Sequence, residues 1–572
     1  MKMKKIKFIF SLAFALVLFS CTDDFREINT NPNVVTPEEA SGRYFITKPQ
    51  VALYGPSRYP YWRAQLIHTD RYAGHFTFGH HGSWWSDELG YTYSSSYTDA
   101  TWGWLAGYAG GLDNYLKLTQ AGAEFENPLM HAVGIIMKGL YFQMFTDVFG
   151  DVPYSEVGDP DIVLPKYDTQ KDIYKGIIAE LESAIETIGD NDRTGQGLQD
   201  LGENDVYFKG DLQRWKKLAN SLVLRIALRA NGAPGDDFSS KAIGDALSRG
   251  LFLEEGEDCV LPKDNQINQW ASACYGDIWW NFGGLGSKWT VGQTLITYML
   301  KNDDPRLPRY AKPAIGGEIT FERPDETSNP DGYANFEKRI RFIAHAVNMA
   351  INLQGGDTTD VLSFAQDMSE AIFKVPENTY YIGQPTRLNS FIKPYARYEF
   401  FSTPADFIVQ EKNKGKPISP ELIMNSGESY LLQAEAALDG FGGDAQALYV
   451  KGVTNSMKFW GVDDGEILKF FASDAPMTQV SKENVAIQRW MNAYTDGFEA
   501  WAVVRKSGYP EELSKGVHDL DIFGPGDING AYPTRMQYGN SAYDKNGENL
   551  QEAINRQGPD KQDTKLWFQK TN

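Results

Sequence analysis

The chain has 572 residues and a formal net charge of −20 at pH 7. This excess of acid repels phosphate backbones and anionic lipid surfaces, so it argues against a nucleic-acid-binding protein and against electrostatic docking on a membrane. Hydrophobic residues make up 42% of the sequence and charged residues 23%, which is typical of a water-soluble globular protein. Beyond the N-terminal segment, no apolar run reaches the roughly 18 residues that a membrane-spanning helix needs.

The first residues have the layout of an export signal. Lysines precede an apolar run from Phe8 to Phe19, and Ser20 and Cys21 follow it. A helix of about 12 residues spans roughly 18 Å, which is too short for a bilayer core of ~30 Å. A small residue followed by cysteine resembles a bacterial lipobox. The resemblance implies cleavage before Cys21 and attachment of acyl chains such as palmitate. The alternative is an ordinary signal peptide with an incidental cysteine. We therefore expect a signal peptide over 1–20 and a lipidated, polar tether over 21–33.

Hydrophobic periodicity predicts a mainly helical protein after the tether. The clearest helix follows Asp211 and ends at Asn231-Gly232. Further helices are predicted from Thr36, over 129–149, 173–188 and 427–438, from about Asp444, and as a pair around Trp490 and 498–501. Helix pairs joined by short turns resemble tetratricopeptide-like units, although no strict consensus of about 34 residues is present.

Four segments between these helices are rich in Gly, Pro, Asn and aromatic residues. They cover 74–101, 189–205, 259–289 and 313–404. We expect long irregular segments here, and in a compact protein such segments usually carry function.

Two of these segments, 74–101 and 259–289, hold eight of the 14 tryptophans when Trp102 and Trp104, directly after the first, are included. An aromatic plane suits the apolar C–H face of a sugar ring, and neighbouring acids and amides suit its hydroxyl rim. The predicted ligand-binding residues are Trp84, Trp85, Asp87, Tyr91 and Tyr93 in the first segment and Tyr275, Trp279, Trp280, Asn281 and Trp289 in the second. The alternative is that these rings pack loops against helices, and packing is the favoured interpretation for Trp102 and Trp104, which lead into a helix.

Four histidines fall close together, at His68, His75, His80 and His81. No fixed zinc spacing accompanies them, so ordinary packing or hydrogen bonding to a ligand is favoured over a metal site, and no metal or cofactor is predicted. No nucleophile elbow, phosphate loop or Cys-His signature is present, which argues against an enzyme. Cys259 and Cys274 form either one disulfide or two buried thiols.

A set of short motifs then becomes recognisable in order along the chain. They are Tyr141-Phe142-Gln143-Met144-Phe145-Thr146-Asp147-Val148-Phe149-Gly150-Asp151-Val152-Pro153-Tyr154, the helix with Trp215, Leu224 and Arg225, Asn302-Asp303-Asp304-Pro305-Arg306-Leu307, Glu428-Ser429-Tyr430-Leu431, Asp496-Gly497-Phe498-Glu499-Ala500-Trp501, Arg505-Lys506-Ser507-Gly508-Tyr509-Pro510, and 560–567. This set resembles the SusD/RagB family of outer-membrane lipoproteins of Bacteroidota. One departure is the run from Tyr532 to Gly539, where the family often has an Arg-rich, Pro-containing element. The motifs themselves are expected to pack the fold rather than to bind ligand.

The resemblance implies an all-α, tetratricopeptide-like protein with a loop-rich ligand face, formed by a single domain over 34–572. It implies a binder rather than a catalyst, lipid-anchored at Cys21 on the outer membrane and facing the exterior. Such proteins capture oligosaccharides and deliver them to a SusC-like TonB-dependent transporter. Capture of oligopeptides is one alternative; a surface glycosidase and a purely structural transporter subunit are others.

Overall fold

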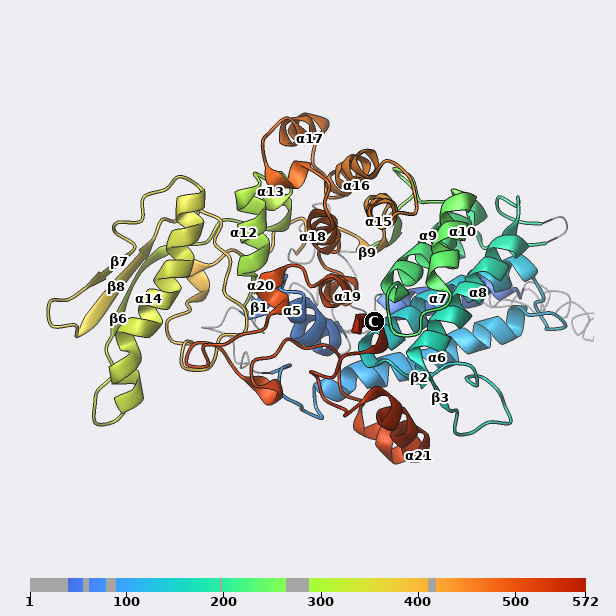
Figure 1. Cartoon of the computed structure of the whole chain (residues 1–572), viewed down its shortest axis with the longest axis horizontal. Helices are drawn as coiled ribbons and strands as arrows, with labels where there is room; N and C mark the ends of the chain where they lie inside the picture. The colour runs from blue at the N-terminus through green and yellow to red at the C-terminus, as the bar shows by residue number, and fades with distance from the viewer. Residues whose placement is uncertain are drawn as a thin grey trace, which may run out of the picture.

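Long helices make up most of the protein, as the computed structural model shows (Figure 1). The structure describes residues 40–54, 61–78, 89–195, 198–263, 288–409 and 418–571. The N-terminal helices are η1 (Gly42–Phe45), α3 (Thr47–Tyr54), the π-helix η2 (Tyr61–Thr69), α5 (Asp70–Tyr72), α6 (Thr98–Thr119), α7 (Pro128–Phe149), α8 (Gln170–Ile188), η3 (Gly202–Asn204), α9 (Leu212–Ala230) and α10 (Ser239–Arg249). None of the described helices is both long and apolar enough to cross a membrane.

The middle and C-terminal parts add further helices and short strands. The helices are α12 (Gln293–Lys301), α13 (Leu307–Tyr310), α14 (Pro330–Leu353), η4 (Tyr398–Phe400), α15 (Ser426–Leu438), α16 (Ala445–Phe459), α17 (Asp464–Phe471), η5 (Pro476–Thr478), α18 (Lys482–Asn492), α19 (Gly497–Ser507), α20 (Glu511–Ser514), η6 (Gly526–Ile528), α21 (Asn540–Gln557) and η7 (Trp567–Gln569). The strands are β1 (Phe76–Phe78), β2 (Val152–Pro153), β3 (Tyr167–Asp168), β4 (Cys259–Leu261), β5 (Trp289–Val291), β6 (Gly317–Glu322), β7 (Leu362–Phe364), β8 (Glu370–Val375) and β9 (Glu421–Met424).

Local sequence signals set the ends of the main helices. The Asp211 carboxylate accepts a hydrogen bond from the backbone N–H of Arg214 and caps α9, whose last residue precedes Asn231. Asn127 caps α7 in the same way, and Pro128 occupies the first turn, where a missing N–H costs nothing. The predicted helices over 129–149, 173–188, after Asp211 and over 427–438 are therefore confirmed to within a few residues, and the helix predicted from Thr36 lies outside the described residues.

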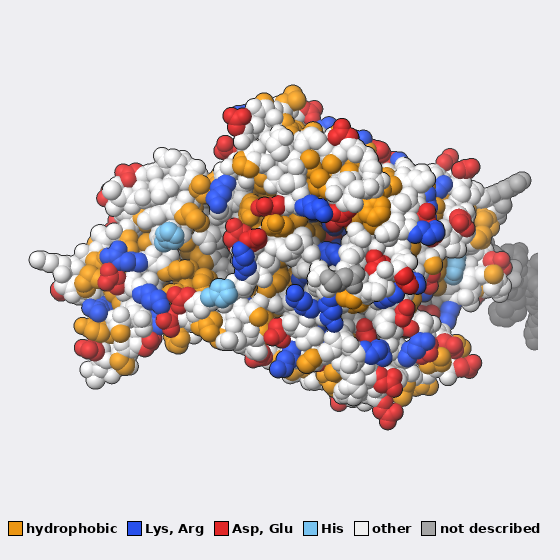
Figure 2. All heavy atoms as spheres, in the orientation of Figure 1, with side chains coloured by type: hydrophobic (Ala, Val, Ile, Leu, Met, Phe, Trp, Pro, Cys, Tyr) orange, Lys and Arg blue, Asp and Glu red, His pale blue; other side chains and the backbone are white. Residues whose placement is uncertain are grey.

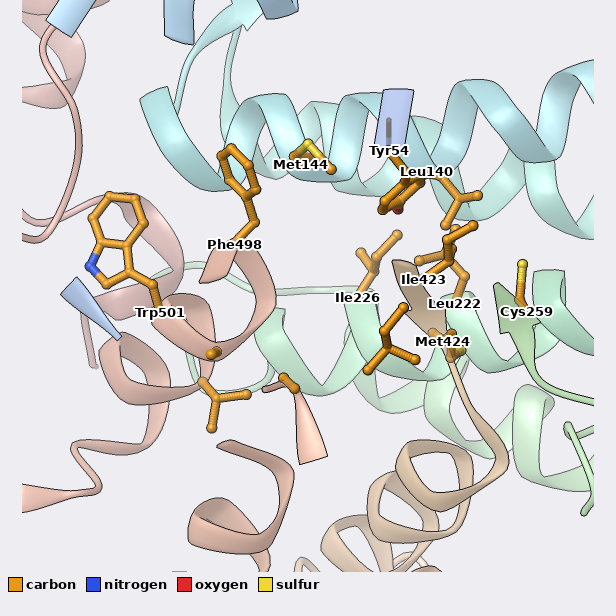
Figure 3. Packing of buried hydrophobic residues seen from close by; sticks show 14 of the residues in the cluster. Tyr54, Leu140, Met144, Leu222, Ile226, Cys259, Ile423, Met424, Phe498 and Trp501 are labelled. Carbon is orange, nitrogen blue, oxygen red and sulfur yellow. The ribbon is translucent and has the colours of Figure 1, made fainter. Parts of the chain in front are cut away.

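Neighbouring helices pack in pairs along the chain. Helix α7 packs on α8, α8 on α9, and α9 on α10, while α15 pairs with α16 and α18 with α19. Figure 3 shows side chains of α7, α9 and α19 meeting those of β9 in one apolar cluster. The predicted mainly helical, tetratricopeptide-like class is confirmed, because each amphipathic helix buries its apolar face against the next pair.

The recognisable sequence motifs meet in a buried ion-pair network. Arg225 on α9 lies 2.6 Å from Glu428 on α15, and Arg229 on α9 contacts both Asp147 on α7 and Glu499 on α19. All five side chains are at least nine-tenths buried. Burial by itself would raise the pKa of Glu499, but the surrounding arginines outweigh burial and hold this pKa below its usual range. These motifs thus join four helices at the core, as the packing interpretation predicts.

A second apolar cluster lies away from the helix pairs and corrects one prediction. Residues 313–404 were expected to be irregular, but they contain α14 and a three-stranded antiparallel sheet in the order β6-β8-β7, at the left of Figure 1. Asn329 caps α14 and Pro330 begins it, and the buried positions recur every three or four residues. The prediction was wrong because the Gly- and Pro-rich flanks outweighed this internal period. The structure also shows Cys259 as a buried free thiol, while Cys274 lies outside the described residues.

Candidate ligand-binding site

A two-stranded ladder brings together the attachment points of the two tryptophan-rich segments. Strands β1 and β5 pair antiparallel, with Phe78 opposite Trp289. Phe78 is the last described residue before 79–88, and Lys288 is the first after 264–287. The segment with Trp84 and Trp85 and the segment with Trp279 and Trp280 therefore join the described fold at the same end of one ladder, although about 200 residues separate them in sequence.

Gln384 fastens this ladder from a third segment of the chain. Its backbone N–H donates to the carbonyl of Val291 at 3.0 Å, and its side-chain carbonyl accepts from the Thr290 hydroxyl at 3.1 Å. Its side-chain amide also donates to the carbonyl of Phe78. Because Gln384 is fully buried, these hydrogen bonds are protected from water and keep β1 and β5 in register. No local pattern indicates this residue, because its side-chain partners Thr290 and Phe78 are far away along the chain.

The residues that follow the first segment are held by buried polar groups. The Arg71 guanidinium donates to the carbonyls of Ile67 and Leu89, and the Tyr72 hydroxyl donates to the carbonyl of Gly90. Gln562, near the C-terminus, also donates to Gly90 at 2.8 Å. Both sides of the 79–88 segment are therefore attached to buried parts of the described fold.

Two of the predicted ligand-binding residues are core residues instead. Trp289 is fully buried, with its ring centroid 4.4 Å from that of Phe78. Tyr91 is 4% exposed, and the guanidinium groups of Arg71 and Arg387 lie 5.0 and 4.3 Å from its ring centroid. Neither ring offers a face to a ligand in this structure, because each one packs the base of the segment that it borders.

Tyr93 has a different setting, and the remaining predicted residues are not described. The Tyr93 side chain is half-buried, and its hydroxyl lies 2.9 Å from Asp99 and 2.7 Å from Asn540. Trp84, Trp85, Asp87, Tyr275, Trp279, Trp280, Asn281 and Cys21 lie outside the described residues. The packing interpretation of Trp102 is confirmed, because its indole is buried against Phe145, Phe149, Tyr167 and Tyr538. Trp104 is partly buried and donates to the carbonyl of Ala52.

The two described histidines of the predicted cluster are packing residues. His68 and His75 are fully buried, and burial lowers the pKa of His68 to about 4 and that of His75 to about 3. Both rings are therefore neutral at neutral pH. His75 lies 3.1 Å from the carbonyl of Trp490. Within the described residues, no group of three or more His, Cys, Asp and Glu side chains is placed to hold a metal ion; His80 and His81 lie outside them.

Comparison with known proteins places this architecture in a family. The model of a SusD-like family, described as "Starch-binding associating with outer membrane", matches residues 62–355 and 378–539. The chain belongs to this SusD-like family. The match includes β1, β5 and Gln384, so the ladder that joins the two tryptophan-rich segments lies within the family region.

Solved structures with the same fold cover nearly the whole chain. A chitin-binding protein is 23% identical over 93% of this chain and 100% of its own, with a TM-score of 0.67. A SusD-like protein from Bacteroides thetaiotaomicron is 19% identical over 92% of this chain and 98% of its own, at 0.65. A chitin-binding SusD homologue from Flavobacterium johnsoniae is 18% identical over 93% and 99%, at 0.66. At these identities the likeness establishes the fold. A search of curated proteins finds no match.

Proposed function

We propose that this SusD-like protein is a cell-surface lipoprotein that binds oligosaccharides or polysaccharide and delivers them to a SusC-like TonB-dependent transporter. The observation that carries the proposal is the pairing of Phe78 with Trp289. This pairing attaches two segments rich in tryptophan to one edge of a rigid fold, so their aromatic rings can act on one ligand. The family description and its association with the outer membrane support the same role.

The ligand chemistry follows from the residue types in these segments. Trp84-Trp85 and Trp279-Trp280 are adjacent pairs. In extended chain, neighbouring side chains point to opposite sides, so one ring of each pair can anchor the loop while the other stacks on a sugar. Asp87 and Asn281 would then bond the hydroxyl rim. Because the family model is described as starch-binding and two similar structures are of chitin-binding proteins, malto- and chito-oligosaccharides are the first ligands to test.

The test removes one ring from each segment. Trp85→Ala and Trp280→Ala should each weaken glycan binding, measured by calorimetry, by about 1–3 kcal/mol, the range for an aromatic contact at the centre of a site. This corresponds to about fivefold to more than a hundredfold in affinity. Tyr44→Ala is the matched control, because it removes an aromatic side chain that is 41% exposed on η1. Unchanged affinity in both tryptophan variants would contradict the two-segment site, and preferential binding of a peptide library would favour the oligopeptide alternative.

Binding without catalysis and anchoring at Cys21 complete the proposal. The protein should release no reducing sugar from a polysaccharide that it binds, whereas release would indicate a glycosidase. Cys21→Ala should free the protein from the cell surface and impair uptake, since the acyl chains would be its anchor. Its glycan affinity in solution should not change, because Cys21 lies in the predicted tether, outside both tryptophan-rich segments.

A further inference from the structure

A pair of tyrosines lies where two segments far apart in the sequence meet, near the described end of the first tryptophan-rich segment. Tyr93 follows the first tryptophan-rich segment, and Tyr543 lies in the first turns of α21, at the bottom of Figure 1. The Tyr93 hydroxyl contacts Asp99 and Asn540, and the backbone N–H of Asn540 donates to the same Asp99 carboxylate at 3.2 Å. These hydrogen bonds fix the start of α21 against the start of α6.

The ring of Tyr543 is both fixed and exposed. Its hydroxyl donates to Asp560 at 2.7 Å, and Asp560 in turn lies 3.0 Å from the Arg535 guanidinium. The side chain is nevertheless 44% exposed. The hydrogen bond to Asp560 thus holds the hydroxyl end while the residue stays open to solvent. A ring that is already held in one orientation loses little conformational entropy when it stacks on a ligand.

The groups around the two rings suit the hydroxyl rim of a sugar. Asn540 is exposed, and within the described residues its side-chain amide nitrogen has no hydrogen-bond partner. Asp527 accepts from the backbone N–H of Tyr93 through one carboxylate oxygen. Burial and the adjacent carboxylates raise the pKa of Tyr93 to about 12 and raise that of Tyr543, so both hydroxyls keep their protons at neutral pH. Acidic and basic side chains are interspersed on the face of the molecule drawn in Figure 2.

Tyr93 lies close in sequence to the described end of the first tryptophan-rich segment. Leu89 is the first described residue after the segment that carries Trp84 and Trp85, and Tyr93 comes four residues later. Trp85 and Tyr93 are eight residues apart, and eight residues of extended chain span at most about 29 Å, so a long oligosaccharide is needed to reach both. The carbonyl of Tyr91 also accepts from the backbone N–H of Asp527 at 2.9 Å, which fixes the intervening residues.

We propose that Tyr543, with Tyr93 and Asn540, forms an outer subsite that binds the distal sugar units of a long, neutral glycan chain. This inference rests on the proposed function, since it extends the glycan-binding site rather than replacing it. The subsite makes affinity depend on chain length: a short oligosaccharide fills only the tryptophan segments, while a longer one also reaches Tyr543.

The experiment measures binding of malto- and chito-oligosaccharides of increasing length by calorimetry. Tyr543→Ala should lower the affinity for the longest oligosaccharides about tenfold and leave that for the shortest ones unchanged. Tyr543→Phe keeps the ring and should retain most of the affinity, and Asn540→Ala should show a smaller, length-dependent loss. Tyr44→Ala is the control with similar exposure, 41% against 44%, and urea unfolding establishes that each variant is folded.

The possible failures are distinguishable. If Trp85→Ala weakens binding while Tyr543→Ala binds every length as the wild type does, the outer subsite is refuted and the proposed function stands. Equal losses for short and long oligosaccharides in Tyr543→Ala would also refute it, because Tyr543 would then belong to the central site. If the wild-type protein binds neither series, the proposed function fails for these glycans and the subsite inference fails with it.

Discussion

Gly292 offers a direct test of whether the β1–β5 ladder supports the ligand site. A Cβ atom added at Gly292 would lie 2.0 Å from the carbonyl oxygen of Gly74 and 3.0 Å from its carbon. Because these are backbone atoms, no change of rotamer relieves the contact. The φ angle of Gly292 is −68°, which any residue adopts, so space rather than backbone conformation requires glycine here.

The expected cost follows from this overlap. Gly292→Ala must push β1 and β5 apart, and overpacking of this kind typically destabilises a protein by about 1–3 kcal/mol. Gly244→Ala is the matched control, because it makes the same chemical change inside α10, where an added Cβ meets nothing within 4 Å. Alanine in an exposed helix interior should stabilise by up to about 1 kcal/mol. The two variants should therefore shift the urea unfolding midpoint in opposite directions.

The functional consequence is measured on the same proteins. Gly292 follows Val291, which pairs with Phe76, so the strands separate first at that end. Because the ladder is only three residues long, the Phe78–Trp289 pair at its other end, where both tryptophan-rich segments attach, should be disturbed as well. Glycan affinity should fall in Gly292→Ala and stay unchanged in Gly244→Ala. A Gly292→Ala protein with wild-type stability would refute the steric argument. Lost stability with wild-type affinity would instead show that the ladder does not position the site.

Two further variants test the buried charges. Arg229→Met leaves Asp147 and Glu499 buried without this partner, so it should lower the free energy of unfolding in urea by about 3–5 kcal/mol. Lys338→Ala removes an exposed ion pair and should cost at most about 1 kcal/mol. Equal losses in the two variants would contradict the assigned role of the network. Burial and the charge of Glu499 raise the pKa of Asp496 to about 8. The folded state therefore retains a proton that the unfolded chain loses above about pH 4, so this group makes stability fall as pH rises from about 4 to 8. Asp496→Asn cannot ionise and should gain up to about 4 kcal/mol relative to the wild type between pH 5 and 8; a constant difference between the two proteins would refute this.

Local and periodic signals in the sequence determined much of the helical scaffold. Asp211 and Asn127 mark the starts of α9 and α7 because a capping side chain acts on backbone only two or three residues away. The ordered motifs predicted the family correctly, since residues such as Arg225 and Glu499 must meet to neutralise one another in the core. Over 313–404 the two signals conflict: the cap and the spacing of apolar residues indicate helix α14, whereas the Gly- and Pro-rich composition predicts irregular structure, and the spacing is the signal that the fold follows.

The location of the site depended on the tertiary structure. Composition alone singled out two tryptophan-rich segments, but it could not distinguish the buried Trp289 and Tyr91 from rings that face solvent, because burial depends on distant residues such as Phe78 and Arg387. The sequence likewise gave no reason to connect Tyr93 with Tyr543, which 449 intervening residues separate. Local patterns therefore determined which helices form and to which family the chain belongs. Strand pairing and the packing of remote segments decided which aromatic rings meet at one surface, because those contacts exist only once the chain has folded.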